Sequence, residues 1–268
     1  MIFYFSGTGN SQAAAETIAR VQRERLVSII QAIEAEQYDY VLQKGEAVIF
    51  VFPVYAWAPP EIVMRFLSRL TFLGEDPDYL GVIVTYSKQI GNCFKVVHQA
   101  IEEKGWRLTS FYTLKMPHNY LIVGHTDSYE RVYEILAATL PTLERMNQEI
   151  AQKEHVYEQA TGFFPRIRTL AGQRWMRIMS KRITPFYAND QCISCKVCEK
   201  ICPTQCIEVI QKPSWKGECL HCLACLHYCP KSAIQYGRSM ERKKRYTHPD
   251  IRWYELNHSS TKNRPTKF

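Results

Sequence analysis

The sequence predicts an α/β protein with a doubly wound, five-stranded parallel sheet, followed by a small α+β domain rich in cysteine. Two observations predict this architecture. Over residues 1–155, apolar strand-like runs alternate with helical segments, the pattern of a parallel sheet covered by helices on both faces. Nine of the ten cysteines then fall between residues 192 and 229. A chain of 268 residues has room for about two domains.

The elements of the first domain follow from apolar periodicity and from turn residues. The stretch 47–52 is entirely apolar and gives the strongest strand. The expected strands are 2–5, 26–30, 47–52, 80–86 and one within 106–116. The expected helices are 11–21, 60–70, 92–104 and 127–155. Pro60 suits the first turn of its helix, and Pro141 predicts a kink in the last one.

The cysteine-rich segment contains the pattern C-x2-C-x2-C-x3-C-P twice. A shift of 27 residues places every cysteine of the first copy on one of the second, and Pro203 on Pro230. The segment is therefore an internal duplication. Two-residue gaps let three thiolates wrap one face of a cubane cluster, and in the bacterial two-cluster pattern the fourth cysteine binds the other cluster.

This spacing predicts two 4Fe-4S clusters. The first is assigned to Cys192, Cys195, Cys198 and Cys229, and the second to Cys219, Cys222, Cys225 and Cys202. Paired C-x2-C units also bind zinc, but zinc needs neither the third cysteine nor the proline after the fourth. A disulfide framework is disfavoured, because the chain is long and shows no secretory signal.

Two cysteines lie outside the repeated pattern. Cys206 aligns with Ala233 of the second copy, so we expect it to pack as a small buried apolar residue. Cys93 lies far upstream. Packing is favoured for Cys93 too, and a thiol near a cofactor is the alternative.

The loop after the first strand reads Ser6-Gly7-Thr8-Gly9-Asn10-Ser11 and leads directly into a helix. Inward-facing backbone N–H groups, short polar side chains and the helix N-terminus would together form a phosphate cradle. The loop has no lysine, so it is not a Walker A loop, and it does not match G-x-G-x-x-G. An ordinary glycine turn before a capped helix is the alternative. The candidate ligands are Ser6, Thr8, Gly9, Asn10 and Ser11.

The run S-G-T-G-N-S after the first strand resembles the phosphate loop of flavodoxins, which hold flavin mononucleotide (FMN). Two later loops agree with this resemblance, since they follow the third and fourth strands where flavodoxins contact the flavin ring. Simple packing is the alternative for the aromatic residues among them. Lys88 stands where many flavodoxins carry an acidic residue. The resemblance implies FMN contacts at Pro53, Val54, Tyr55, Ala56, Trp57, Thr85, Tyr86, Ser87, Gly91 and Asn92.

The cysteine-rich segment in turn resembles bacterial two-cluster ferredoxins. The whole chain therefore resembles a flavodoxin-ferredoxin fusion of the kind found in anaerobes. The expected domains are a flavodoxin-like FMN-binding domain at 1–155, a basic helical linker at 156–187, a ferredoxin-like domain at 188–237 and a basic tail at 238–268.

Charge is divided unevenly along the chain. Residues 1–155 carry 14 Lys and Arg against 18 Asp and Glu, whereas the remainder carries 20 against 8. We interpret the basic flanks as docking either an acidic redox partner or the acidic first domain, with a plain solvated linker equally favoured. No motif for nucleic-acid recognition accompanies the charge. No apolar run is long enough to span a membrane, and we expect a cytoplasmic protein.

These cofactors together indicate the class of chemistry. A flavin exchanges one or two electrons and each cluster exchanges one. The first hypothesis is an electron-transfer protein that passes single electrons between two clusters and FMN, and so links a redox partner to a second acceptor without a catalytic side chain. The second is a flavin-dependent oxidoreductase of a small molecule, fed by its own clusters, with Tyr55, Trp57, His118 and Tyr120 shaping the pocket. A redox sensor is the third.

Overall fold

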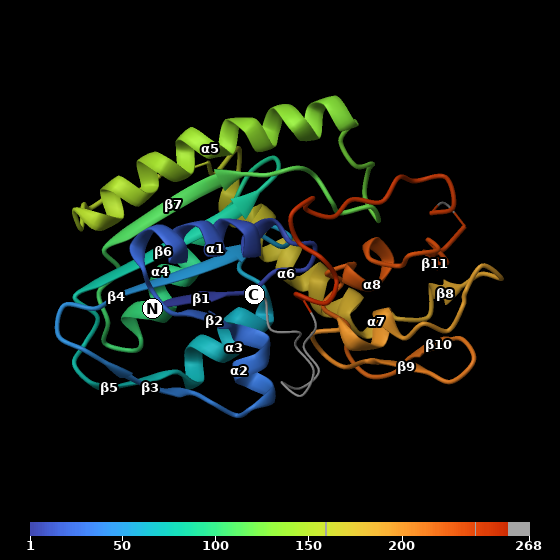
Figure 1. Cartoon of the computed structure of the whole chain (residues 1–268), viewed down its shortest axis with the longest axis horizontal. Coiled ribbons are helices and arrows are strands. Elements are labelled where there is room, and N and C mark those ends of the chain that lie inside the picture. The colour runs from blue at the N-terminus through green and yellow to red at the C-terminus, as the bar shows by residue number, and fades with distance from the viewer. Residues whose placement is uncertain (159, 239, 257–268) are drawn as a thin grey trace.

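The first part of the chain is built on a five-stranded sheet. A computed structural model describes residues 1–158, 160–238 and 240–256 (Figure 1). The strand order is β2-β1-β4-β6-β7, and all neighbours are parallel. This is the 2-1-3-4-5 order of flavodoxin-like sheets, so the predicted fold class of this part is confirmed. The strands are β1 (Ile2–Tyr4), β2 (Leu26–Ser28), β4 (Ala47–Pro53), β6 (Tyr79–Tyr86) and β7 (Ser110–Lys115).

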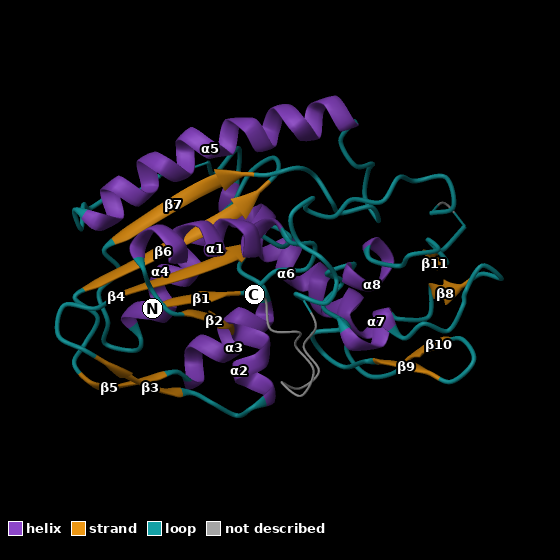
Figure 2. Ribbon diagram, viewed as in Figure 1, coloured by secondary structure: helices purple, strands orange, loops and turns teal. Residues whose placement is uncertain are grey.

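Helices cover both faces of this sheet (Figure 2). Phe3 and Phe50 point into the core beneath one group of helices, whereas Ile2 and Ile49 point into the core beneath the other. This alternation follows from the two-residue period of a strand. The first group is α2 (Ile29–Glu34), α3 (Glu61–Arg69) and α4 (Cys93–Glu102), and the second is α1 (Asn10–Gln22) and α5 (Tyr129–Ala151).

Two details differ from the sequence prediction. Residues 29 and 30, expected in a strand, begin α2, because the Ser28 side chain accepts a hydrogen bond from the Gln31 backbone N–H at 3.4 Å and caps that helix. The pair β3 (Asp39–Leu42) and β5 (Thr71–Gly74) forms a separate parallel ribbon that was not expected. Pro141, where a kink was predicted, lies inside α5.

The cysteine-rich part repeats one unit twice. A shift of 27 residues carries the strand-helix-strand unit of the first copy onto that of the second, with the same bounds. Exchanging the two copies also carries the antiparallel pair Phe186 and Tyr236 onto the pair Pro213 and Val209. The sequence duplication is therefore a two-fold structural repeat. Its elements are β8 (Phe186–Ala188), α7 (Val197–Lys200), β9 (Ile207–Val209), β10 (Pro213–Trp215), α8 (Ala224–His227) and β11 (Ile234–Tyr236).

The repeat extends to the backbone of the cysteine loops. Ser194 and Lys196 have φ of 55° and 62°, and their counterparts His221 and Leu223 have 50° and 60°. These left-handed residues flank the second cysteine of each ladder. They turn each loop tightly enough for three cysteine side chains to lie around one space.

Helix α6 (Pro165–Lys181) connects the two parts. No helix in the described ranges is long and apolar enough to cross a membrane. Of the basic tail expected at 238–268, residues 257–268 lie outside the described part of the chain.

Candidate functional site

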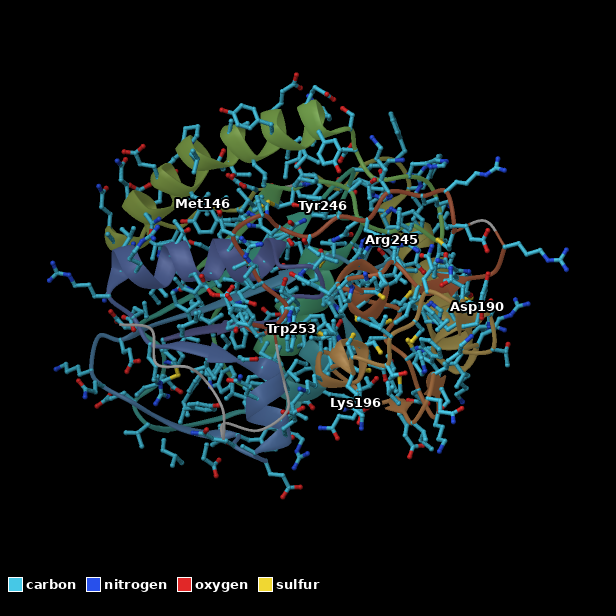
Figure 3. The ribbon with its side chains drawn as sticks, turned by 45° about the vertical axis from the view of Figure 1, so that its right-hand side comes forward. Met146, Asp190, Lys196, Arg245, Tyr246 and Trp253 are labelled. Carbon is cyan, nitrogen blue, oxygen red and sulfur yellow. The ribbon has the colours of Figure 1, made fainter. Side chains whose placement is uncertain are left out.

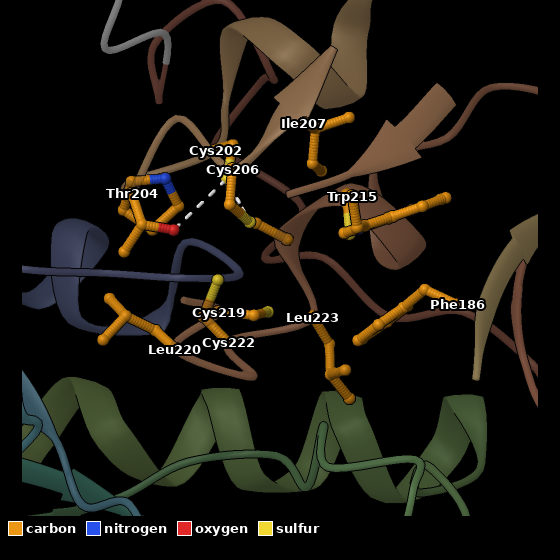
Figure 4. Close-up of a pocket in the computed structure, with 13 residues that line it drawn as sticks. Phe186, Cys202, Thr204, Cys206, Ile207, Trp215, Cys219, Leu220, Cys222 and Leu223 are labelled. Carbon is orange, nitrogen blue, oxygen red and sulfur yellow. Dashed lines mark hydrogen bonds between the residues drawn. The ribbon is translucent and has the colours of Figure 1, made fainter. Parts of the chain in front are cut away.

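The eight ladder cysteines line two cavities. The outer cavity is lined by Cys192, Cys195, Cys198 and Cys229. The inner cavity is lined by Cys202, Cys206, Cys219, Cys222 and Cys225 (Figure 4). The fourth cysteine of each ladder lies in the cavity of the other ladder. This is the partition expected from the sequence, with Cys206 added to the inner cavity.

The thiols surround these spaces instead of converging on a point. Among the described residues, no group of three or more His, Cys, Asp or Glu side chains is arranged to hold a single metal ion. Burial raises the pKa of Cys198 and of Cys222 to about 12. Without a bound cation these thiols are therefore protonated at neutral pH.

The two cavities differ in their access to solvent. Cys195 is exposed, and Ile193 beside it is 58% exposed. The lysines Lys196 and Lys231 on the same rim are also exposed. At the inner cavity, Cys202, Cys219 and Cys225 are buried. The outer cavity thus faces solvent, whereas the inner one faces the first domain.

Cys206 is buried, as expected, and its Sγ lies 3.6 Å from the Sγ of Cys202. Thr204 Oγ1 lies 3.7 Å from the Sγ of Cys202. Figure 4 shows both contacts on one side of the inner cavity. Cys93 is buried in the core beneath α3 and α4, where burial raises the pKa of its thiol.

The phosphate-type loop at the end of β1 is buried. The polar residues Ser6, Thr8, Asn10 and Ser11 are at most 5% exposed. Ser6 Oγ accepts from the Gly9 backbone N–H at 3.1 Å, and Ser11 Oγ is paired with Thr85 Oγ1 at 2.7 Å.

Residues from outside the loop supply the other partners. Asn119 Nδ2 donates to Thr8 Oγ1 at 2.6 Å, and Tyr246 Oη donates to Asn10 Oδ1 at 2.6 Å. All four polar side chains of the loop are therefore bonded within the protein.

Two segments of the C-terminal half lie directly on this loop. A Cβ on Gly7 would lie 3.0 Å from the carbonyl oxygen of Cys222, and one on Gly9 would lie 2.8 Å from Cβ of His248. The His248 backbone N–H also donates to the carbonyl of Thr8 at 2.9 Å. Residues 246–251 are called the covering segment below.

The loop expected to stack on a flavin ring packs against protein. Tyr55 is partly buried; its hydroxyl lies 2.8 Å from the Cβ position of Gly7, and its ring meets Phe5 edge-on at 6.0 Å. Ala56 and Trp57 form a tight turn with positive φ, closed by hydrogen bonds between Tyr55 and Ala58.

Helix α6 closes over the same edge of the sheet. Thr169 Oγ1 accepts from the Asn92 backbone N–H at 2.8 Å and donates to the carbonyl of Trp57 at 2.9 Å. Gly172 lies against the Ala56 carbonyl, and Gly91 lies against Trp57. The two loops that would sandwich a flavin ring therefore contact each other and α6.

The remaining predicted flavin contacts lie nearby. The Val54 backbone N–H, just after Pro53, donates to the carbonyl of Thr85 at 2.9 Å, which joins the ends of β4 and β6. The carbonyl of Tyr86 accepts from the Met116 backbone N–H at 2.7 Å. Ser87 Oγ is 3.0 Å from His118 Nδ1, and Lys88 is exposed.

These observations test whether FMN fits the site. The cradle's polar side chains are bonded within the protein, the spaces beside Gly7 and Gly9 are filled, and the ring loops touch. In this arrangement the residues of the expected site do not fit FMN.

From the sequence, docking of the basic flank through charge and a plain solvated linker were equally favoured, and the observed contacts of α6 fit neither. Helix α6 does pack on the first domain, but it does so through Thr169 and Gly172. Within the described ranges, no ion pair involves an Arg or Lys of α6. Small residues that allow close backbone approach, and not arginines, make this contact.

Several site residues carried no local signal in the sequence. Asn119, Tyr246 and His248 reach the loop from positions more than 100 residues away along the chain. Arg245, counted as part of a basic flank, donates to the carbonyl of Ile234 at 2.9 Å and lies near Cys225 of the inner cavity and Cys229 of the outer cavity. Figure 3 places Tyr246 and Arg245 close together between the two parts.

Comparison with known proteins gives only similarities of fold. No protein-family model matches the chain, and no curated protein matches it. Among solved structures, the flavodoxin of Streptococcus pneumonia TIGR4 is 16% identical, with a TM-score of 0.35 over 57% of this chain and 97% of that one. The Trp repressor binding protein of Bacillus subtilis is 12% identical, with a TM-score of 0.33 over 52% and 95%. The rubredoxin oxygen:oxidoreductase of Desulfovibrio gigas is 18% identical, with a TM-score of 0.32 over 55% and 36%.

Proposed function

We propose that this chain is an electron-transfer iron-sulfur protein that holds two 4Fe-4S clusters. The observation that carries the proposal is the division of the eight ladder cysteines, four to each cavity. Cys192, Cys195, Cys198 and Cys229 would hold the outer cluster, and Cys202, Cys219, Cys222 and Cys225 the inner one. Such clusters supply reversible one-electron transfer.

The chemistry of the donor set supports clusters over zinc. A tetrahedral zinc ion needs four sulfurs about 2.3 Å from one point, whereas these thiols line the walls of a larger space. The high pKa values of the buried thiols mean that a positively charged group must accompany their ionisation. Reduced thiols of this kind suit a reducing compartment such as the cytoplasm.

The rim of the outer cavity supports a site for a redox partner protein. The exposed apolar side chain of Ile193 lies beside Cys195, with the exposed lysines Lys196 and Lys231 on the same rim. A partner with an acidic, partly apolar patch matches this rim. Electrostatic attraction of that kind mainly raises the rate of association. The inner cavity would then exchange electrons through the outer one.

The flavin hypothesis is the second candidate, and two observations favour it: the loop sequence at residues 6–11 and the flavodoxin-like strand order. Among the structures similar in fold, one is named as a flavodoxin. For FMN to bind, the covering segment would have to leave the loop, and Trp57 would have to separate from Gly91. The proposal therefore does not include FMN in the docked chain.

Low-temperature electron paramagnetic resonance tests the main proposal. The full chain is reconstituted anaerobically with iron and sulfide, desalted and reduced with dithionite. We expect a spectrum of two reduced clusters that interact magnetically, because the two sets of cysteines share one small module. A protein that gives no such signal and retains zinc instead would exclude the proposal.

A further inference from the structure

We infer that the phosphate-type loop, residues 6–11, is the surface of the first domain on which the cysteine-rich part docks, and that it binds no FMN while that part is docked. This inference rests on the proposed function in one respect, namely that the docked part carries its clusters. It departs from the expectation drawn from the loop sequence. Four observations carry it.

The first observation is that the polar side chains of the loop are already bonded. A bound phosphate would need donors from side chains and backbone N–H groups at this loop. The Gly9 backbone N–H donates instead to Ser6 Oγ at 3.1 Å, and Asn10 Nδ2 donates to the carbonyl of Pro117 at 3.3 Å. Asn10 Oδ1 also accepts a bond of 2.6 Å from Tyr246 of the covering segment. A phosphate that took these donors would leave Ser6 Oγ and the Pro117 carbonyl without these bonds, which is unfavourable.

The second observation is that protein atoms lie directly against the two glycines of the loop. Gly9 has φ of 96°, and its missing Cβ leaves room for His248 and Ile251, each within 2.9 Å of the Cβ position. Gly7 leaves room for the backbone of Cys222 in the same way. Protein atoms therefore fill the space that glycine leaves free for a phosphate in a phosphate-binding loop.

The third observation is that the covering segment is also held by apolar packing. Ile251 belongs to a buried cluster with Val197 and Ala224, which begin α7 and α8. Ala13 of α1 packs against the same cluster. The segment therefore joins the loop and helix after β1 to both repeats of the cysteine-rich part. Releasing it would expose this cluster to water.

The fourth observation is the position of the inner cavity. Doubly wound sheets bind their ligands beyond the carboxyl ends of the strands. Cys222, which lines the inner cavity, lies at that edge, and Tyr55 packs against it where a flavin would have been expected. The inner cluster site thus stands next to the position that a flavin takes in this fold.

Retention of FMN by the reconstituted full chain tests the inference directly. The protein is incubated with excess FMN and passed through a desalting column, and flavin and iron are then measured in the protein fraction. We expect iron without flavin. One FMN retained per chain, with the clusters still present, would overturn the inference and leave the iron-sulfur proposal standing. Absence of iron would be a failure of the proposed function instead.

A pair of glycine variants tests whether the covering segment docks on the loop through Gly9. Gly9→Ala and Gly45→Ala both force alanine into a positive φ, but a Cβ at Gly45 meets nothing within 4 Å. In hydrogen-deuterium exchange we expect Gly9→Ala to increase exchange in residues 246–251, and Gly45→Ala to leave it unchanged. Equal exchange in the two variants would contradict the inference. If Gly9→Ala does not fold, FMN retention by the unmodified chain decides.

Discussion

The Cys222 carbonyl oxygen lies 3.0 Å from the point that a Cβ on Gly7 would occupy. This contact joins a cysteine loop of the inner cavity to the loop after the first strand, 215 residues earlier in the chain. The two parts of the molecule therefore meet at the sheet edge where doubly wound folds bind their ligands. This contact underlies both the assignment of the inner cluster site and the exclusion of FMN from the docked chain.

Cys229→Ala tests the exchange of the fourth cysteine between the two ladders. Cys229 lines the outer cavity, so we expect this variant to lose the outer cluster and keep the inner one. Iron content should fall from about eight to about four per chain, measured after anaerobic reconstitution. Cys206→Ala is the matched control and should keep all its iron. Full iron in Cys229→Ala would show that this cysteine is not a ligand.

Arg245→Gln tests the electrostatic effect of a half-buried cation near one cysteine of each cavity. Its guanidinium interacts with Cys225 and Cys229. A positive charge stabilises the reduced, more negative form of a cluster. Removing it should lower the reduction potential by on the order of tens of millivolts, measured by redox titration. Arg242→Gln, on an exposed residue, is the control and should shift the potential much less. Equal shifts would argue against a specific role.

Tyr246→Phe tests the hydrogen bond that links the covering segment to the loop. Tyr246 donates to Asn10 Oδ1 in a buried setting at 2.6 Å. The variant leaves that acceptor unpaired and should lower the free energy of unfolding by about 1–2 kcal/mol, measured by urea denaturation. Tyr254→Phe, on a residue that is 48% exposed, should change it very little. Equal stabilities of the two variants would argue against this bond.

Docking of the covering segment should weaken in acid because of His248. Burial lowers the pKa of His248 below its ordinary value of 6.5, and Asp250 opposes this shift. The released segment therefore binds a proton at higher pH than the docked one does. Docking is fully favourable above pH 6.5 and becomes less favourable as the pH falls below it.

Hydrogen-deuterium exchange over residues 246–251 measures this dependence. After correction for the intrinsic pH dependence of exchange, protection should begin to fall near pH 6.5 and continue to fall at lower pH. His248→Gln cannot titrate and should show a flatter dependence. The same pH dependence in both proteins would assign the effect to another group.

Local patterns in the sequence predicted most of the fold. The apolar runs at 47–52 and 80–86 became the two longest strands of the sheet, and the 27-residue repeat reappears in the strands, helices and pairing of the cysteine-rich part. Ser28 shows where a short local signal was missed, because its capping bond turns the expected end of a strand into the start of α2.

The flavin expectation shows what local patterns do not contain. The loop at residues 6–11 has the composition of a phosphate cradle, but its surroundings are supplied by Asn119, Cys222, Tyr246 and His248. Such contacts depend on how distant segments pack, and no periodicity or motif records them. The cysteine assignment is different, because the spacing within each loop restricts which thiols can surround one space.

Iron and acid-labile sulfide in the anaerobically reconstituted full chain test the central claim most directly. We expect about eight irons and about eight sulfides per chain, the content of two 4Fe-4S clusters. A chain that binds zinc and contains no sulfide would contradict the claim.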